Sequence, residues 1–371
     1  TNLDTLDTLL GGGSDMTGIS VDGNVKLDGN YPTGTGNVAL GDTALDSLDS
    51  GSPGGSNTAI GYRALISNTT GAGNTALGRD AGYYTTTGSD NTYIGLAAGP
   101  NVATSTASNN TALGRSALRS LTTGVNNTAV GGIGQNSKAP LHSNTTGGYN
   151  VAVGNQALAT NVSGDYNTAI GYQSLYLNTA DNNVSVGLNS MYNNSTGTEN
   201  VSVGTNTMDS NTTGSNNTAV GRNALGANTT ASNNVGVGNN AGDSITTGAS
   251  NVQVGNYAGQ ATTTQFGTTA IGHYAGFYST ADTNVFVGYL TGYGGGNTSI
   301  ATSTGSGCVL IGSYSNASSN STYETVVGHS LTGKGNATGL FGGASGNYNA
   351  ANSSSWNTTS DRRLKKNITD S

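Results

Sequence analysis

The C-terminal stretch TSDRRLKKNITDS, residues 359–371, combines residue types that can carry out nucleophilic chemistry. A serine hydroxyl is a weak nucleophile and needs an adjacent base, and a lysine amine can act as that base once burial lowers its pKa. The stretch has Ser360 near its start, followed by Lys365 and Lys366. A nucleophile and a base are therefore both present in this short segment.

Tyrosine is the second source of candidate functional residues. The chain has 18 Tyr against four Phe and one Trp. Exposed tyrosine rings can stack on sugar rings, but packing between chains would use them equally well. Tyr83 and Tyr84 are adjacent, and Tyr149 and Tyr293 lie where the chain's internal repeat is most widely spaced. We interpret these four residues as candidate contacts to a receptor.

Composition argues against several other kinds of site. Only 12 Lys and Arg stand in a chain of net charge −7, which disfavours a nucleic-acid partner. His142, His273 and His329 are isolated, so no metal or other cofactor is expected, and Cys308 is expected to be a small buried side chain. No apolar run approaches the roughly 18 residues of a membrane-spanning helix, so no membrane insertion is predicted.

A short phrase repeats along most of the chain. Hydrophobic residues make up only 33% of the sequence, which makes a conventional core doubtful. The phrase Asn-Thr-Ala-Ile-Gly and its variants end in a glycine, and nine of the seventeen spacings between these glycines are 17 residues. This period is typical of a solenoid rather than of a helical repeat. The glycines are residues 41, 61, 78, 95, 114, 131, 154, 171, 187, 204, 221, 238, 255, 272, 288, 312, 328 and 342.

The phrase has the period of a β-strand. Its second position is Thr or Val, its third is small, and its fourth is Ile, Val or Leu, as in NTAIG at 57–61 and NVAVG at 150–154. Because the fourth position is the strictest, we expect it to be the most buried, with the second facing inward beside it. Rows of Thr also suggest ice binding, but inward-facing Thr would argue against that interpretation.

The remainder of each repeat predicts a return strand and a turn. The segment after the glycine, such as YRAL at 62–65, is expected to be the return strand, and NTTG at 68–71 a turn. Each coil is too short to be stable alone, so its backbone must pair with neighbouring coils. The predicted fold is all-β, a parallel β-roll or β-solenoid of about 17-residue coils. Such a thin roll would gain from packing against copies of itself.

Two spacings are longer, 23 residues from Gly131 to Gly154 and 24 from Gly288 to Gly312. Extra residues in a solenoid normally leave as loops on one face. The first loop is expected to carry Tyr149 and the second Tyr293. Receptor contact and tolerated surface insertion are both open interpretations of these loops.

The NTAIG and YRAL phrases resemble the head repeats of trimeric autotransporter adhesins. The resemblance covers about residues 37–343, although the period here is 17 residues and family repeats are commonly shorter. It implies a left-handed parallel β-roll packed as a homotrimer. Handedness and trimer packing are thus implied by the family and not by the spacing.

The Ser-Asp-x-Arg-Leu-Lys core of the C-terminal stretch resembles the opening of the endosialidase-type intramolecular chaperone domain. That family is found at the C-termini of phage tail spikes and fibres, where it assembles trimeric β-structure and then releases itself by self-cleavage. The resemblance implies Ser360 as nucleophile and Lys365 as base, with Asp361 and Arg363 in the local framework. Only the first dozen residues of such a domain are present.

The predicted organisation has four parts: an N-terminal connecting segment (1–36), a repeat shaft (37–343), a polar linker (344–359) and the start of a chaperone domain (360–371). The predicted function is an extracellular, homotrimeric virion tail fibre or tail spike shaft, binding a host surface glycan or protein receptor. It is not expected to be an enzyme apart from a single self-cleavage. A bacterial cell-surface adhesin or extracellular filament is the first alternative, and a polysaccharide depolymerase is the second.

Overall fold

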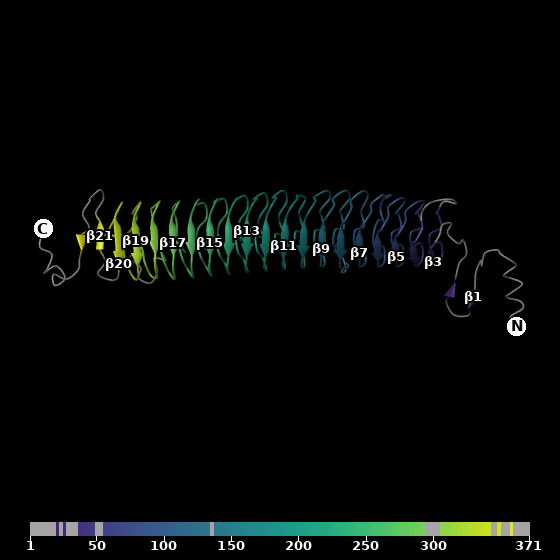
Figure 1. Cartoon of the computed structure of the whole chain (residues 1–371), viewed down its shortest axis with the longest axis horizontal. Coiled ribbons are helices and arrows are strands. Elements are labelled where there is room, and N and C mark those ends of the chain that lie inside the picture. Colours follow the sequence, from purple (N-terminus) through teal and green to yellow (C-terminus); the bar gives the residue numbers. More distant parts are fainter. Residues whose placement is uncertain are drawn as a thin grey trace, which may run out of the picture. The chain divides into compact units, whose positions relative to one another are not determined.

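The protein is described by a computed structural model (Figure 1). It describes residues 20–21, 25–26, 36–48, 55–133, 137–293, 305–342, 347–349 and 357–358. The chain divides into two compact units, unit 1 (Thr1–Asn182) and unit 2 (Asn183–Ser371). Each unit is a parallel β-solenoid, and the described residues contain no helix. The predicted fold class is therefore confirmed.

Each coil contributes one short strand that pairs with the strand of the next coil. In unit 1 the parallel strands are β3 (Val38–Leu40), β4 (Thr58–Ile60), β5 (Thr75–Leu77), β6 (Thr92–Ile94), β7 (Thr111–Leu113), β8 (Thr128–Val130), β9 (Val151–Val153) and β10 (Thr168–Ile170). The register joins equivalent residues, for example Thr58 with Thr75. An antiparallel pair, β1 (Ser20–Val21) and β2 (Val25–Lys26), precedes them.

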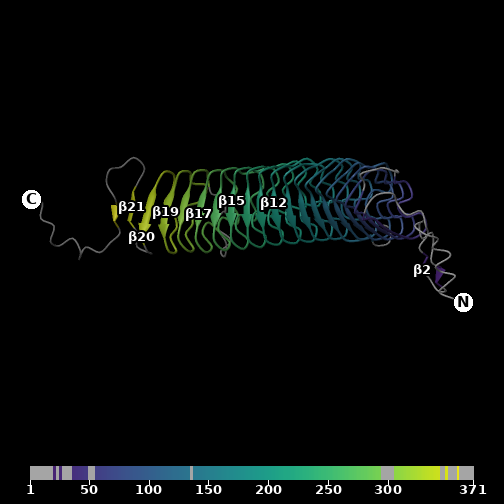
Figure 2. The same cartoon turned by 45° about the vertical axis from the view of Figure 1, so that its right-hand side comes forward.

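Unit 2 continues the same pattern. Its parallel strands are β11 (Val184–Val186), β12 (Val201–Val203), β13 (Thr218–Val220), β14 (Val235–Val237), β15 (Val252–Val254), β16 (Thr269–Ile271), β17 (Val285–Val287), β18 (Val309–Ile311), β19 (Thr325–Gly328) and β20 (Gly339–Gly342). β21 (Asn347–Asn349) and β22 (Asn357–Thr358) then pair antiparallel. In both units the turns beside the strands follow one another in rows (Figure 2).

The expectation about which strand residues face inward was wrong. The middle residue is the buried one: Ala59 and Ala76 are fully buried, whereas Leu77 in the fourth position is 45% exposed. Side chains alternate along a strand, so when the middle residue points inward both of its neighbours point outward. The interior of so thin a coil has room for alanine but not for two rows of branched side chains. The Thr positions thus face outward, which removes the argument made against ice binding.

The predicted return strand is a turn. In YRAL at 62–65, Arg63 and Leu65 have φ of 55° and 52°, in the left-handed region. Two such residues within three positions bend the backbone instead of extending it. The turn is held by the preceding coil, as when the Arg63 amide donates to the Asp42 carbonyl at 3.0 Å. Each repeat of the described parallel stacks therefore has one strand.

A row of buried asparagines joins the coils from inside. The Asn57 Oδ1 accepts from the Asn74 amide at 2.9 Å, and the Asn57 Nδ2 donates to the Gly71 carbonyl at 2.9 Å. The Asn74 Oδ1 in turn accepts from the Asn91 amide and Nδ2. Each side chain thereby satisfies buried backbone groups of a turn and of the next coil. The regular spacing of Asn before most of the parallel strands has this structural cause.

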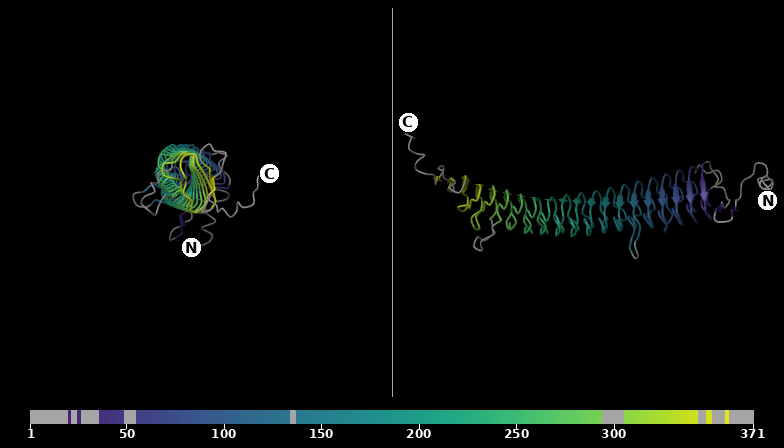
Figure 3. Two further views of the ribbon diagram at one scale, coloured as in Figure 1. Left: turned by 90° about the vertical axis from the view of Figure 1, so that its left-hand side faces the viewer. Right: turned by 90° about the horizontal axis from the view of Figure 1, so that it is seen from below.

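The inward-facing side chains of the strand and of the turn are complementary in size. Many strands present a small residue, Ala or Ser, and the turn of the same coil then often supplies a buried Leu or Met, such as Leu65 beside Ala59 or Met208 beside Ser202. Where a strand presents the large Phe286, the flanking turn positions are Gly276 and Gly292. A Cβ on either glycine would lie about 2.5 Å or less from the Phe286 ring, so no larger residue fits. In each unit the ribbon winds in narrow coils (Figure 3).

The two longer spacings differ from expectation in one respect. Leu141 is buried, and its amide donates to the Ala157 carbonyl, so the regular turn resumes before it. Tyr149 consequently lies in an ordinary turn ahead of β9 and not in an inserted loop. The second long spacing includes residues 294–304, which lie outside the described residues.

Candidate functional site

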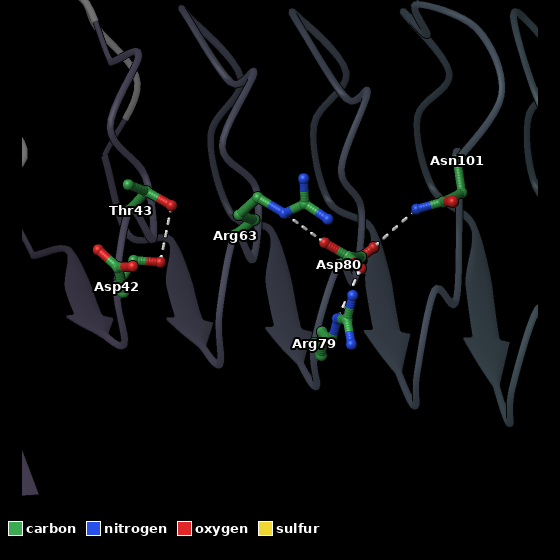
Figure 4. A network of polar contacts seen from close by, with 6 residues as sticks. All are labelled: Asp42, Thr43, Arg63, Arg79, Asp80 and Asn101. Carbon is green, nitrogen blue, oxygen red and sulfur yellow. Dashed lines mark hydrogen bonds and ion pairs between the residues drawn. The ribbon is translucent and has the colours of Figure 1, made fainter.

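Arg63, Arg79 and Asp80 form an ion-pair cluster in the turns that follow β4 and β5 (Figure 4). The Asp80 carboxylate lies 2.8 Å from Arg63 Nε through Oδ1 and 3.1 Å from Arg79 Nε through Oδ2. The Asn101 Nδ2 donates to the Asp80 backbone carbonyl at 3.2 Å. The Asp80 side chain is 12% exposed and that of Arg79 is 64% exposed. The mostly buried carboxylate of Asp80 thus orients the two more exposed guanidinium groups of Arg63 and Arg79.

Aromatic rings surround the same guanidinium groups. The Arg63 Cζ lies 4.7 Å from the Tyr62 ring centre and 4.9 Å from that of Tyr83, within cation–π range. Tyr83 in turn contacts Tyr84 edge-on, with ring centres 4.5 Å apart. Two of the four predicted tyrosines, Tyr83 and Tyr84, therefore belong to this cluster. The arginines beside them were missed. A whole coil of sequence separates Arg63 from Tyr83, but Arg79 lies in the same turn as Tyr83, and that proximity was a signal that could have found it.

Further basic side chains continue along this side of unit 1. Arg115 follows the motif glycine of its coil, as Arg79 does, and both are exposed. The Asn101 amide donates to the Arg119 carbonyl at 2.9 Å, which places Arg119 one coil beyond Asn101. We call Arg63, Arg79, Arg115, Arg119 and Lys138 the basic turn surface.

The pKa of His142 is affected by the positive charges of this region. Partial burial lowers the pKa of His142, and the positive charges of Arg119 and Lys138 lower it further. Lys138 Nζ also donates to Ser143 Oγ at 3.3 Å. His142 is therefore neutral near pH 7 and adds no charge to the basic turn surface.

The other two predicted tyrosines, Tyr149 and Tyr293, each contact other aromatic rings within their own unit. Tyr149 stacks on Tyr166 at 4.9 Å in the turns that precede β9 and β10. Tyr293 belongs to unit 2, where its ring centre lies 5.3 Å from that of Tyr274 and 5.6 Å from that of Phe277. Burial raises the pKa of Tyr293, as do the neighbouring phenols. Within unit 1, Tyr149 therefore lies in a turn ahead of a strand, whereas Tyr83 and Tyr84 lie in a turn that follows one.

Ser360 and Lys365 lie outside the described residues. Among the residues that are described, no group of three or more His, Cys, Asp or Glu could hold a metal ion.

The outward faces of the strands form a second surface. We call the second- and fourth-position side chains of β3–β10 in unit 1, and of β11–β20 in unit 2, the strand stripe. Its members are Thr, Val, Ile and Leu with few exceptions, and many are well exposed, including Leu113 at 44% and Ile271 at 40%. The fourth position is apolar in every one of these strands, so within each unit it forms a continuous row of apolar side chains, and monomeric proteins rarely expose large continuous apolar surfaces.

Two carboxylates in unit 2 lie on either side of the turn that contains Gly226. Asp243 Oδ1 would lie 2.6 Å from a Cβ placed on Gly226, and Asp209 occupies the equivalent position one coil before Gly226. Partial burial raises the pKa of both, and the Asp209 charge raises that of Asp243 further. Acid and base roles in glycoside hydrolysis require environments that separate two pKa values. Here both environments shift the pKa in the same direction.

Glu324 is a buried carboxylate at the position of the row asparagines in unit 2. Its Oε2 accepts from the Ser318 amide at 2.8 Å and from Ser321 Oγ at 2.6 Å. Its Oε1 accepts from the Gly335 amide at 2.9 Å and from Thr338 Oγ1 at 3.1 Å. Burial acts to raise the pKa of Glu324, but these hydrogen bonds outweigh it and the pKa is lowered from 4.5. The ionised carboxylate thus ties together the last parallel coils.

Acid is therefore expected to weaken the end of unit 2. A carboxylate with a depressed folded-state pKa contributes stability that is complete above its unfolded pKa. This contribution is lost as the pH falls below about 4.5 through the folded pKa. Glu324→Gln should cost about 1–3 kcal/mol at neutral pH and flatten the acid limb of the stability curve. Denaturant unfolding at several pH values, with the exposed Glu199→Gln as control, measures this; equal acid limbs in wild type and Glu324→Gln would contradict it.

The described fold and surfaces define a β-solenoid repeat protein with one apolar and one basic surface. The chain matches no protein-family model, and a search of curated proteins finds no match. No described helix has the length and apolar character needed to cross a membrane.

Proposed function

We propose that the protein is the self-associating shaft of an extracellular fibre, a homotrimer that carries a virion to its host. The strand stripe is the observation that supports this most strongly. A repeat fold that placed its alanines inside and its branched residues outside would be poorly soluble as a single chain. When a second and a third copy cover the strand stripe, its apolar side chains are no longer exposed to water.

The size of the strand stripe is sufficient for stable association. Its part in unit 1 has two outward side chains in each of eight strands. If each offers on the order of 50 Å² of accessible surface, the total is roughly 800 Å², the area that one partner contributes to a standard interface. Threefold packing follows from the resemblance to trimeric autotransporter head repeats. The β-solenoid fold is compatible with fibre, spike and adhesin shafts.

The mass of the assembled protein in solution tests this proposal. Light scattering or native mass spectrometry is expected to give three chains of 36.8 kDa. The trimer should also resist boiling in detergent, because unfolding of such β-structure is slow. A monomeric particle would refute the fibre proposal.

The C-terminal stretch supports a phage fibre over the alternatives. Its resemblance to the intramolecular chaperone leads us to assign Ser360 as the nucleophile and Lys365 as the base of one self-cleavage. A folding domain would help here, since non-local β-structure associates slowly and risks mispairing. Normal release of the chaperone from a Ser360→Ala precursor on a denaturing gel would refute the assignment.

A bacterial surface adhesin or filament is the second candidate, because the repeats and the strand stripe would serve it equally well. The sequence that follows residue 371 in the precursor separates the two: a complete chaperone domain favours the phage fibre, and a membrane anchor the adhesin.

A further inference from the structure

We propose that the basic turn surface of unit 1 binds an acidic polysaccharide, a chain of sugars that carries carboxylates. This inference names the chemical class of the host receptor, and its biological role rests on the proposed attachment function. The binding surface itself lies within one unit and is argued from its charges, exposed groups and spacing.

The charge of this region is opposite to that of the chain. The protein as a whole has a net charge of −7, yet between residues 55 and 143 five basic side chains stand against only Asp80 and Asp90. The Asp90 amide donates to the Ala72 carbonyl, so Asp90 lies in the turn ahead of β6 and away from the basic turn surface. The coil before the basic surface carries Asp42 and Asp46 in its turn, which sets a boundary to the positive region.

The guanidinium groups are available to a ligand. Arg63 and Arg79 use Nε toward Asp80, and their terminal Nη atoms have no hydrogen-bond partner among the described residues. Arg115 is exposed and has no ion pair in that part of the chain. The planar guanidinium fork matches a carboxylate with two parallel hydrogen bonds. Arg63 and Arg79 lie on neighbouring coils and Arg115 lies two coils beyond Arg79, so the three forks would engage carboxylates spaced along one ligand chain.

The aromatic residues suit a sugar chain. Tyr62 is 43% exposed and lies directly beside the Arg63 and Arg79 guanidinium groups. A ring at this position can stack on a pyranose while the arginines pair with its carboxylate. Because Asp80 and the two rings already hold Arg63 in place, little side-chain entropy is lost on binding.

The linear density of charge favours a polysaccharide over a nucleic acid. From the turn after β4 to that after β8 the surface spans four strand spacings, about 19 Å at ~4.8 Å each. Five cations over that length correspond to roughly one in every 4–5 Å, whereas duplex DNA carries a charge per ~1.7 Å of axis. A sugar chain with a carboxylate on every residue or every second residue is a closer match.

Binding of polygalacturonate to the full-length protein tests the inference, with neutral dextran and duplex DNA as comparison ligands. The wild type should bind polygalacturonate and should not bind dextran. Its affinity for polygalacturonate should fall as the ionic strength rises. The double variant Arg79→Gln/Arg115→Gln should bind at least tenfold more weakly. Arg222→Gln is the matched control, because Arg222 is exposed and also follows a motif glycine but lies in unit 2. It should bind as the wild type does.

Three outcomes would overturn the inference: equal binding of dextran, wild-type affinity in the double variant, or tighter binding of DNA than of polygalacturonate. The solution mass of the same preparation keeps the two proposals apart. A trimer that fails to bind refutes the polysaccharide site alone, and a monomer that binds refutes the fibre alone.

Discussion

Charged residues in the strand stripe are expected to dissociate the protein into single chains. Val203 and Val220 are the fourth-position residues of neighbouring strands β12 and β13, and they are 36% and 37% exposed. If copies pack on this surface, two lysines there would be buried without partners, at a cost of several kcal/mol each. Val203→Lys/Val220→Lys should therefore give a particle with the mass of one chain, measured by light scattering.

Thr213→Lys is the control for this variant, because Thr213 is exposed in a turn of the same coil. It should remain an oligomer. Since a trimer interface could also be needed for folding, single-cysteine variants give an independent measurement. Thiol cross-linking should join chains of Val203→Cys and not those of Thr213→Cys. An oligomer of unchanged mass in the double-lysine variant, with no cross-link at residue 203, would show that copies do not meet on the strand stripe.

Truncation of Phe286 is expected to be the most destabilising single change in unit 2. Phe286 is fully buried, and the glycines on either side of its ring leave no atoms that could fill the space. Phe286→Ala should lower the free energy of unfolding by about 3–5 kcal/mol. Denaturant unfolding measures this loss, and Phe277→Ala, in a partly exposed turn of the preceding coil, should cost clearly less.

The packing of Phe286 against Gly276 leads to a second prediction, about a pair of substitutions. Gly276→Leu alone should destabilise the protein, because its Cβ would lie 2.5 Å from Phe286 Cδ2. In the Phe286→Ala background the same leucine should recover part of the lost stability, since Ala in the strand with a buried Leu in the turn is the arrangement of several other coils, such as that of Ala59 and Leu65. The leucine would still pay for a left-handed backbone at residue 276, about 1–2 kcal/mol. Additive effects in this double-mutant cycle would show that the two positions do not exchange volume.

The sequence by itself determined the repeat, the place of the motif strand in each coil and the parallel stacking. A 17-residue period with one short β-branched phrase leaves few other ways to pair backbone groups. Equivalent residues such as Thr58 and Thr75 are paired as the alignment of the motif predicts.

Only the tertiary structure decided which side of each strand lies inside. Alternation along a three-residue strand allows either Ala59 or its two neighbours to face inward. The narrow choice of residue types at the fourth position did not show which of the two arrangements occurs. The volume of the closed coil made the choice, because a turn leucine already fills the space opposite the strand. The left-handed turn residues depended on the same closure, as Leu65 shows.

The basic turn surface likewise depended on the stack. Arg79 and Arg115 are 36 residues apart in the sequence, but one coil separates their turns. Residues a whole period apart become neighbours at about 4.8 Å per coil, so scattered single charges gather into one surface. The composition gives only the number of basic residues and the negative net charge of the whole chain. Their position on one side of the coils comes from the fold, because stacking in register turns a repeated position into a row.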